Sequence, residues 1–581
     1  MRKKWLLKGK NADFQSLAKD NNISTVLARL IVNRGYETSS EVHHYLFDKI
    51  EDIPSPWLLK DMDKAVEILL QNREEQIGIA SDFDCDGIFA GYILHKGLAN
   101  IGIRSRLYTP DRIAEGYGLN KRIVDQAKSE GVTLLLTCDN GIAAGAEVEY
   151  AIEQGMTVIV TDHHDIQGES PKAHAVIDPK QDDCNYPFEG ICGAVVAYKL
   201  IQALYEKEGK APTEVEQFLP FAAMATVTDV MDLSQENRVI VKEGLLRIQN
   251  TDNLGLLALM RAQNIVPAQV RAYHIGFIIG PCFNASGRLS TVEDAFQLLM
   301  AKDAKEADRL ARHLKELNDE RKDMTIQGTE QAFERIEKRD WEQEKVLVVY
   351  LPGCHESLVG IIAGRVRERY NRPTIVFTDA GEDLVKGSGR SIEAYNMFEE
   401  LYKCKEMFER FGGHPMAAGI TMVKENLELL RTQLNQNTTL VENDLCPVVN
   451  IDMAPPLSEV SEYLINQLKL LEPMGKGNTK PVFAGQHFGI LRAVKRGKTG
   501  NVLSMQIMDR AGTKMDAILF HEVDMFEQFL LEEYGSEQVD LLFHNRPNDI
   551  DVAFTFYPDL NEYNGYKTLQ VQITGYCRIQ S

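Results

Sequence analysis

The stretch Ile77-Gly-Ile-Ala-Ser-Asp-Phe-Asp-Cys-Asp-Gly87 places three aspartates directly after a short apolar run. The run Ile77–Ser81 has the composition of a buried strand. Asp82, Asp84 and Asp86 follow at every second position, and in extended backbone such residues point to the same side. Three carboxylates on one side repel one another unless a cation lies between them, and Mg²⁺ and Mn²⁺ prefer clustered oxygen ligands. The stretch therefore predicts a divalent-cation site just beyond a strand.

Strands and helices alternate around this stretch, from about residue 77 to residue 180. The expected strands are Ile77–Ser81, Ser105–Tyr108, Thr133–Thr137, Thr157–Thr161 and Ala175–Ile177. The expected helices between them are Ile88–Asn100, Asn120–Glu130 and Ala144–Gln154. Such alternation predicts an α/β fold with a doubly wound parallel sheet.

Acids and histidines follow several of these strands. Ligands of open α/β sheets bind beyond the carboxyl ends of the strands. The residues expected there, with one acid from a later helical segment, are Asp82, Asp84, Asp86, Asp139, Asp162, His163, His164 and Asp229. Single acids in such loops often only cap the next helix. The whole set instead favours a site for two divalent cations, which about 3.5–4 Å apart can activate a water and stabilise in-line displacement at phosphorus. An aldolase or enolase type of site is the alternative, but it lacks a candidate catalytic lysine.

A second group of motifs has the residue types that bind phosphate. It comprises Ser388-Gly-Arg390, Gly412-Gly413-His414 and Arg288 of Asn284-Ala-Ser-Gly-Arg288. Glycines let the backbone approach an anion, and Arg and Ser donate hydrogen bonds to phosphate oxygens. Each motif alone is also compatible with a simple turn or a surface arginine.

Local basic groups occur within an acidic chain of 581 residues with a formal net charge of −21. One group is Arg365, Arg367, Arg369 and Arg372, and another is Arg492, Lys495, Arg496 and Lys498. The net charge excludes a uniformly basic nucleic-acid coat but not a local basic groove. Such a groove would track a single strand, with Phe483, Phe488 or Tyr566 as candidate stacking partners. Solvated surface charges and core aromatics are the alternative interpretation.

Other classes of protein find no support in the sequence. Neither a P-loop nor a dinucleotide-binding glycine motif occurs, so ATP hydrolysis and nicotinamide redox chemistry are not expected. The nine cysteines are scattered without a C-x-x-C pair, which predicts reduced thiols and a cytoplasmic location. No signal peptide or membrane span is expected.

The motifs together resemble those of the DHH phosphoesterases. The resemblance rests on Asp82-x-Asp84-x-Asp86-Gly87, Cys138-Asp139-Asn-Gly and Asp162-His163-His164. The later motifs resemble the RecJ branch of that family, namely Asn284-Ala-Ser-Gly-Arg288, Gly360-Ile-Ile-Ala-Gly-Arg365, Ser388-Gly-Arg390, Gly412-Gly-His414 and Leu471-Glu-Pro-Met-Gly-Lys-Gly-Asn478. The resemblance covers about residues 50–581.

This resemblance implies a single-stranded-DNA-specific 5′→3′ exonuclease that releases mononucleotides with Mn²⁺ or Mg²⁺ and acts in repair and recombination. The implied metal ligands are Asp82, Asp84, Asp86, Asp139, His163 and Asp229, with His164 beside the metals at the scissile phosphate. The implied DNA-phosphate ligands are Arg288, Arg365, Ser388, Arg390 and His414. A single-strand-binding protein and a helicase are candidate partners, and the chain is expected to be a monomer.

The pattern and the resemblance together divide the chain into five parts. They are a helical N-terminal region (1–70), a DHH catalytic domain (71–235), a helical region with a connecting helix (236–340), a DHHA1 domain (341–440) and an OB-type barrel (445–581). The expected barrel strands are Pro481–Leu491, Val502–Met508, Met515–Phe520, Asp540–Phe543, Asp551–Tyr557 and Leu569–Tyr576.

Three residues depart from the family pattern, namely Cys85, Phe89 and Cys354. All three neighbour implied ligands and are not ligands themselves. Another DHH activity, such as a nanoRNase or a cyclic-dinucleotide phosphodiesterase, is an alternative that the expected barrel argues against. A catalytically silent DNA-binding scaffold is a second alternative, and the complete set of acids and histidines argues against it.

Overall fold

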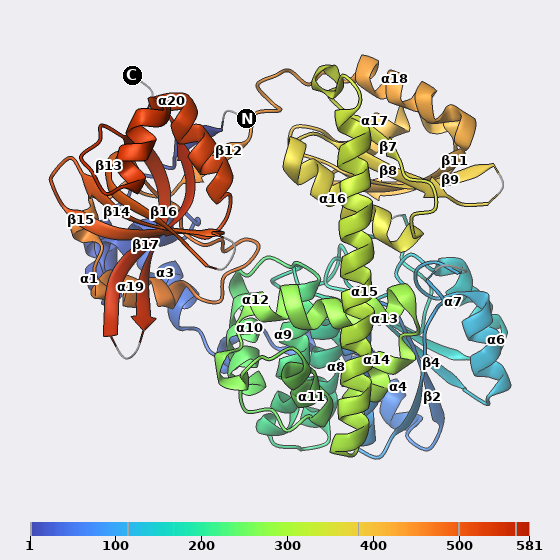
Figure 1. Cartoon of the computed structure of the whole chain (residues 1–581). Coiled ribbons are helices and arrows are strands. Elements are labelled where there is room, and N and C mark those ends of the chain that lie inside the picture. The colour runs from blue at the N-terminus through green and yellow to red at the C-terminus, as the bar shows by residue number, and fades with distance from the viewer. Residues whose placement is uncertain are drawn as a thin grey trace. The chain divides into compact units, whose positions relative to one another are not determined.

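The chain folds into two units. The computed structural model describes residues 3–112, 115–166, 168–381, 383–497, 500–563 and 566–579. One unit, here called the barrel unit, combines Met1–Asp52, Asp232–Gln235 and Val448–Ser581. The other, here called the two-sheet unit, combines Ile53–Met231 and Glu236–Pro447. Figure 1 shows the course of the chain through both.

The first sheet of the two-sheet unit is parallel throughout, with the order β3-β2-β4-β5-β6. Its strands are β2 (Gln76–Ser81), β3 (Arg104–Tyr108), β4 (Leu134–Cys138), β5 (Thr157–Thr161) and β6 (Ala175–Ile177). Every residue of β4 is buried, as expected for a strand covered on both faces. The predicted doubly wound α/β fold is confirmed.

Helices cover both faces of this sheet. They are α4 (Met62–Gln71), α5 (Cys85–Ala99), α6 (Lys121–Ser129), α7 (Gly145–Glu153), α8 (Gly193–Lys207) and α9 (Leu219–Thr228). Helices α6 and α7 share a core with one face of the sheet (Figure 1). Helices α5, α8 and α9 pack against one another, and α5 and α8 also contact the sheet. This arrangement leaves the carboxyl edge of the strands for the polar loops.

A helical region leads from the first sheet to the second. It comprises α10 (Gln235–Ile248), α11 (Leu254–Ala262), α12 (Ala272–His274), the π-helical turn η5 (Ile275–Ile279), α13 (Gly280–Leu289), α14 (Glu293–Leu299) and the connecting helix α15 (Ala304–Glu337). With 34 residues, α15 is about 50 Å long and runs from this region to the second sheet (Figure 1). Leu310 and Leu314, on the apolar side of this helix, are fully buried.

The second sheet has the order β10-β11-β9-β8-β7, in which only β7 and β8 are parallel. Its strands are β7 (Leu347–Tyr350), β8 (Thr374–Asp379), β9 (Leu384–Arg390), β10 (Phe408–His414) and β11 (Ala417–Val423). Its helices are α16 (Val359–Tyr370), α17 (Met397–Tyr402) and α18 (Leu427–Asn437). Residues Val346 and Leu347 enter opposite cores, because successive side chains of extended backbone point to opposite faces.

The barrel unit contains a closed five-stranded barrel with the order β13-β14-β15-β17-β16. Its strands are β13 (Phe483–Arg496), β14 (Val502–Asp509), β15 (Lys514–Leu519), β16 (Asp551–Tyr563) and β17 (Tyr566–Cys577). The other elements are β1 (Lys4–Leu7), α1 (Phe14–Asp20), α2 (Thr25–Val32), α3 (Ser39–Phe47), β12 (Val448–Ile451), α19 (Glu462–Leu468) and α20 (Val523–Phe543).

The two ends of the chain are joined in this unit. Strand β1 pairs in parallel with β12, and the N-terminal helices share one hydrophobic core with the barrel. We expected residues 1–70 to be one helical region. The structure divides them instead, because the first 52 residues pack with the barrel while α4 packs with the first sheet.

Two expectations about the barrel are wrong. Residues Asp540–Phe543 form the end of α20 and no strand, since the three apolar residues after Asp540 do not distinguish a strand from a buried turn of helix. Phe483 and Phe488 are buried in the barrel core, where they cannot stack on bases. Lys498 lies outside the described residues, and so does the side chain of Tyr566.

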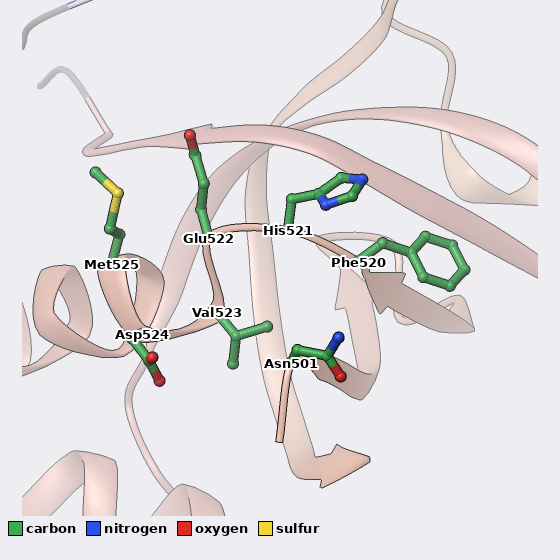
Figure 2. Close-up of a pocket in the computed structure, with 7 residues that line it drawn as sticks. All are labelled: Asn501, Phe520, His521, Glu522, Val523, Asp524 and Met525. Carbon is green, nitrogen blue, oxygen red and sulfur yellow. The ribbon is translucent and has the colours of Figure 1, made fainter. Parts of the chain in front are cut away.

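An open hollow of about 510 Å³ lies where β15 turns into α20. Its lining comprises Asn501, Phe520, His521, Glu522, Val523, Asp524 and Met525 (Figure 2). The two carboxylates of this lining repel phosphate, so the hollow does not suit a DNA backbone. Among the described residues, no helix is both long and apolar enough to cross a membrane.

Candidate metal centre

The acids and histidines predicted from the strand ends meet at the carboxyl edge of the first sheet. Their donor atoms form three overlapping groups, each with all atoms within 4.8 Å of one another. The groups are Asp82–Asp84–Asp139, Asp86–His163–Asp229 and Asp139–His163–His164. Asp229 joins them from the end of α9, outside the sheet. The six expected metal ligands and His164 therefore contribute to one cluster.

The three clustered aspartates do not form the extended row that the sequence suggested. Asp82 follows β2, Asp84 caps α5, and Asp86 lies in the first turn of that helix. The Asp84 carboxylate accepts hydrogen bonds from the backbone N–H groups of Asp86 (3.0 Å) and Gly87 (3.2 Å). A Cβ on Gly87 would lie 2.6 Å from the carbonyl oxygen of Asp82, so only glycine allows the helix to begin here. A strand-to-helix turn, and not strand periodicity, gathers the carboxylates.

Asp139 adopts a strained backbone conformation at the end of β4. Its φ is 60°, a left-handed value that is uncommon outside glycine. Its Oδ1 lies 3.1 Å from His163 Nε2. A Cβ on Gly193 would lie 2.7 Å from the Asp139 side chain, so the start of α8 presses closely against this residue. The conformation and the close packing fix the carboxylate at the centre of the cluster.

Asp86 is oriented by the amino terminus of α8. Its two oxygens accept hydrogen bonds from the N–H groups of Gly193 (2.7 Å) and Ala194 (2.8 Å). The unpaired N–H groups and partial positive charge of a helix N-terminus stabilise a carboxylate. The remaining lone pairs are available to the cluster, where His163 Nε2 lies 3.5 Å from Oδ2.

Asp162 positions the two histidines and is itself saturated. It accepts hydrogen bonds from the N–H groups of Ile142 (2.9 Å), His163 (2.7 Å) and His164 (3.2 Å), and His164 Nδ1 lies 2.7 Å from it. Burial alone would lower the pKa of His164, but the hydrogen bond with Asp162 and the neighbouring carboxylates raise it to about 9. The hydrogen bond with Asp162 therefore favours the protonated form of His164. Burial lowers the pKa of His163, which keeps this imidazole neutral, as a metal ligand must be.

The cluster fits divalent cations. Buried donor atoms without a hydrogen-bond partner in the described structure are Asp82 Oδ2, Asp139 Oδ1 and both ring nitrogens of His163. Burial, and then repulsion among the neighbouring carboxylates, raises the pKa of Asp82 and of Asp139 well above the usual range. Such groups are costly to bury unless a cation compensates them. A carboxylate and imidazole donor set suits Mn²⁺ or Mg²⁺.

Arginines flank the cluster on the side of the second sheet. Arg288, at the end of α13, donates a hydrogen bond from Nη1 to the Ser357 carbonyl at 2.6 Å and so links the two halves of the unit. Burial, together with the charges of Arg112 and Arg321, lowers the pKa of Arg288 to about 9. The guanidinium carbon of Arg112 lies 4.5 Å from the centroid of the Phe83 ring. Burial lowers the pKa of Arg112, and the nearby charges of Asp84 and Asp82 partly oppose this effect. The sequence motifs indicated Arg288 but not Arg112.

The predicted phosphate motifs of the second sheet lie side by side across three strands. Arg390 of β9 is in register with Ala417 of β11, which pairs with His414 of β10. Ser388 is likewise in register with Gly419, which pairs with Gly412, and a Cβ on either glycine would meet nothing within 4 Å. Arg390 Nη1 donates to Ser388 Oγ at 2.9 Å. The glycines therefore leave an open strip between these polar side chains.

The basic group on α16 and after it serves different purposes. Arg365 is exposed and its charge reaches Arg321. Arg369 pairs with Glu337 at 2.6 Å and lies over the Phe333 ring, and Arg372 is buried over Trp341. Arg369 therefore holds α16 against the connecting helix, and Arg372 packs on the segment that follows the connecting helix.

The departures from the family pattern are accommodated by packing. The Cys85 thiol donates to the Gly280 carbonyl at 3.1 Å. Phe89 is fully buried, with its ring centroid 5.0 Å from that of Phe283. Cys354 is partly buried at the connecting helix, near Gly328. None of the three displaces a member of the cluster.

Two further residues hold the cluster in place, although no sequence pattern indicated their role. The Tyr117 hydroxyl donates to the Asp139 carbonyl and lies 3.2 Å from His164 Nδ1. Asn284 Oδ1 accepts a hydrogen bond from the N–H of Cys85 at 2.9 Å and so ties the aspartate turn to α13. A tyrosine in a loop and an asparagine in a helix are too common for the local pattern to reveal such contacts.

Replacing Asn284 with Ala is expected to lower the affinity for Mn²⁺ and the turnover roughly tenfold, the lower end for residues that orient metal ligands. The reason is that the aspartate turn loses its anchor on α13. Mn²⁺ titration by calorimetry measures the effect, and the melting temperature of the metal-free protein serves as the control for folding. Unchanged Mn²⁺ affinity would show that Asn284 does not position the turn.

The comparisons with known proteins agree with this geometry. Residues 76–226 match the DHH family, N-terminal domain, residues 343–439 match the DHHA1 domain, and residues 451–575 match the RecJ OB domain. A carboxylate and histidine cluster at the carboxyl edge of such a sheet, followed by a DHHA1 domain, defines a DHH phosphoesterase. The fold class that the motifs predicted is thereby confirmed.

The most similar relatives specify the branch. The chain is 34% identical to the single-stranded-DNA-specific exonuclease RecJ of Bacillus subtilis (strain 168), covering 88% of this chain but 65% of the relative's length. It is 31% identical to that of Salmonella typhimurium, covering 95% of this chain and 96% of the relative. A crystal structure of RecJ in complex with Mn²⁺ from Thermus thermophilus superposes with a TM-score of 0.82 at 25% identity, over 100% of this chain and 80% of that one. The chain belongs to the RecJ family of single-stranded-DNA-specific exonucleases.

Proposed function

We propose that this exonuclease removes mononucleotides from the 5′ end of single-stranded DNA with two divalent cations, Mn²⁺ or Mg²⁺, in DNA repair and recombination. The observation that carries the proposal is the cluster of buried carboxylate and imidazole atoms, several of which make no hydrogen bond in the described structure, with Arg288 and Arg112 nearby. The 5′ polarity rests on the resemblance to RecJ. The chain has the same barrel domain as these relatives, which argues against the smaller dinucleotide-degrading members of the class.

The residues of the cluster divide into ligands and supports. Asp82, Asp84, Asp86, Asp139, His163 and Asp229 would hold the cations, which when bound supply an activated water and charge stabilisation at the phosphodiester. His164 stands beside this set with Nδ1 2.7 Å from Asp162, a hydrogen bond that favours its charged form, and is proposed to donate a hydrogen bond to a non-bridging oxygen of the scissile phosphate.

Residues on and near the second sheet are proposed to bind the single strand of DNA. Arg288, Arg365, Ser388, Arg390 and His414 are proposed to bind DNA phosphates, including the phosphate near the 5′ end. The support comes from the open strip between Ser388, Arg390 and His414, which lets a phosphate approach the backbone closely. Because these contacts are to phosphates, they would bind strands of any sequence. The barrel is proposed to guide the incoming strand.

Partner proteins, oligomeric state and location in the cell are proposed as well. A single-strand-binding protein and a helicase are proposed as partners, because both act where a free single strand exists. We also propose that the protein acts as a monomer in the cytoplasm, where its DNA substrate is found.

Digestion of a long single strand labelled at either end tests the proposal. With Mn²⁺ present, a 5′ label is expected to appear first as a mononucleotide, while a 3′ label stays on long products until late in the reaction. Excess chelator is expected to stop both, and duplex DNA with blunt ends is the control substrate. Early release of the 3′ label, or full activity in chelator, would refute the polarity or the metal requirement respectively.

A further inference from the structure

Two neighbouring aromatic side chains are exposed on the two-sheet unit. Tyr273 and Phe277 are 61% and 69% exposed, although they stack on each other with ring centroids 5.1 Å apart and an angle of 27° between the rings. We call this pair the aromatic platform. Single exposed apolar residues are ordinary on a protein surface, whereas adjoining exposed apolar side chains can mark an interaction site.

The elements that carry the aromatic platform pack against α9, the helix that ends at the candidate metal ligand Asp229. Tyr273 belongs to α12 and Phe277 to the π-helical turn η5, and π-helical turns are frequent at functional sites. A Cβ on Gly276 would lie 3.4 Å from Val227, and one on Gly280 would lie 2.2 Å from Thr228. The turn therefore packs directly on the last turn of α9.

The same turn of α9 carries a candidate metal ligand. Asp229 caps α9, with its Oδ2 3.8 Å from His163 Nε2. The next residue, Val230, is 58% exposed and adopts a left-handed φ of 56°. Exposed apolar side chains are therefore present both on the turn that packs against α9 and directly after the candidate ligand Asp229, and the exposed Arg271 precedes Tyr273 by two residues.

We propose that the aromatic platform stacks on bases of the single strand next to the metal centre. This inference rests on the proposed function and adds a base-binding site that uses no sequence-specific contact. Every nucleobase has a flat π face, so stacking tolerates any sequence, as an exonuclease requires. The barrel aromatics Phe483 and Phe488 cannot serve this purpose because they are buried.

Single-strand binding by the full-length chain tests the platform. Wild type, Tyr273→Ala, Phe277→Ala and the double variant would bind fluorescein-labelled dT20 in chelator, where cleavage is stopped, with anisotropy as the readout. The double variant is expected to bind roughly tenfold more weakly, a typical loss for a stacked base. Tyr273→Phe is expected to retain wild-type affinity, because the flat ring remains. A 2-aminopurine base in the strand should be quenched by wild type and less by the double variant.

A second stacked pair supplies the matched control. Phe398 and Tyr402 of α17 are also four residues apart and stack at 6.2 Å and 28°, and Tyr402 is 53% exposed. Tyr402→Ala is expected to leave the affinity for dT20 unchanged. An equal loss in that variant, or wild-type affinity in the double variant, would overturn the proposal. If the double variant keeps wild-type affinity for dT20 but its sedimentation coefficient differs from that of wild type, the platform contacts a second copy of the chain and not bases.

The proposed function is tested separately in the same series. Wild type that fails to degrade the strand with Mn²⁺, while the double variant still loses affinity for dT20, would refute the nuclease proposal and support the platform. Unchanged melting temperatures are expected, because both side chains are mostly in water.

Discussion

Asp139→Asn is expected to lower the turnover of single-stranded DNA on the order of a thousandfold, as removal of a central charge from such a site does. The substitution removes the charge while keeping the shape of the side chain. Asparagine also tolerates the left-handed backbone that Asp139 adopts, with φ of 60°, so the turn should survive. Steady-state degradation of a labelled strand with Mn²⁺ measures the effect.

Binding should separate from turnover in this variant. Asp139 contacts His163 at 3.1 Å and none of the arginines that would bind phosphate, so the affinity for dT20 in chelator should change little. The thermal stabilisation by Mn²⁺ should fall in the same variant, because a ligand that binds the folded state raises its stability. Normal turnover would remove Asp139 from the catalytic set.

An exposed aspartate of the same unit serves as the control. Asp183 is 71% exposed and pairs with Lys60 at 2.6 Å, away from the cluster. Asp183→Asn changes the net charge of the chain equally and is expected to leave turnover and the Mn²⁺ response unchanged. A comparable loss in this variant would show that net charge, and not the cluster, sets the rate.

Lys199→Met is expected to destabilise the protein by about 3–5 kcal/mol, the usual cost of leaving one charge of a buried pair alone. Lys199 is fully buried on α8, with its Nζ 3.2 Å from Glu236 Oε2 and donating to the Pro54 carbonyl at 2.6 Å. The Tyr186 hydroxyl donates to the same Glu236 oxygen at 2.9 Å. Methionine fills a similar volume, so the lost free energy of unfolding reflects the carboxylate of Glu236 and the carbonyl of Pro54 that are left without Lys199. Urea denaturation measures this loss.

Two further variants test this account. Lys199→Met combined with Glu236→Gln should recover much of the loss, because the amide keeps an acceptor for Tyr186 without a buried charge. Lys210→Met breaks a more exposed pair with Glu214 (2.8 Å) and should change the midpoint of urea denaturation far less than Lys199→Met does. A double variant as unstable as the single one would assign the loss to packing instead of charge.

Much of the first sheet could be predicted from local pattern. The runs around residues 77–81, 134–138 and 157–161 are apolar and short, and each ends on acids or histidines. Because parallel strands present their carboxyl ends at one edge, the meeting of these loops follows from the strand pattern alone. The same pattern misled in detail at Asp82–Asp86, where the helix begins earlier than strand periodicity assumed.

Other parts of the site depend on contacts between distant segments. Asp229 enters the cluster from α9, Asn284 reaches Cys85 across 199 positions of sequence, and Tyr117 reaches Asp139 from a loop. Asp229 was expected in the cluster, whereas nothing in the local pattern of Asn284 or Tyr117 separates these contacts from those of ordinary capping or surface side chains. Their roles exist only once the helices pack against the sheet.

The amino-acid sequence by itself determined the α/β class, the strand ends that carry the acids and histidines, and the family, because these depend on short-range periodicity and on motif spacing. The tertiary structure decided which aromatics are core and which are exposed, placed Phe488 inside the barrel and Phe277 in water, and joined the first 52 residues to the barrel. The physical reason is that burial is a property of the assembled packing. Two phenylalanines with similar neighbours along the chain can differ in it completely.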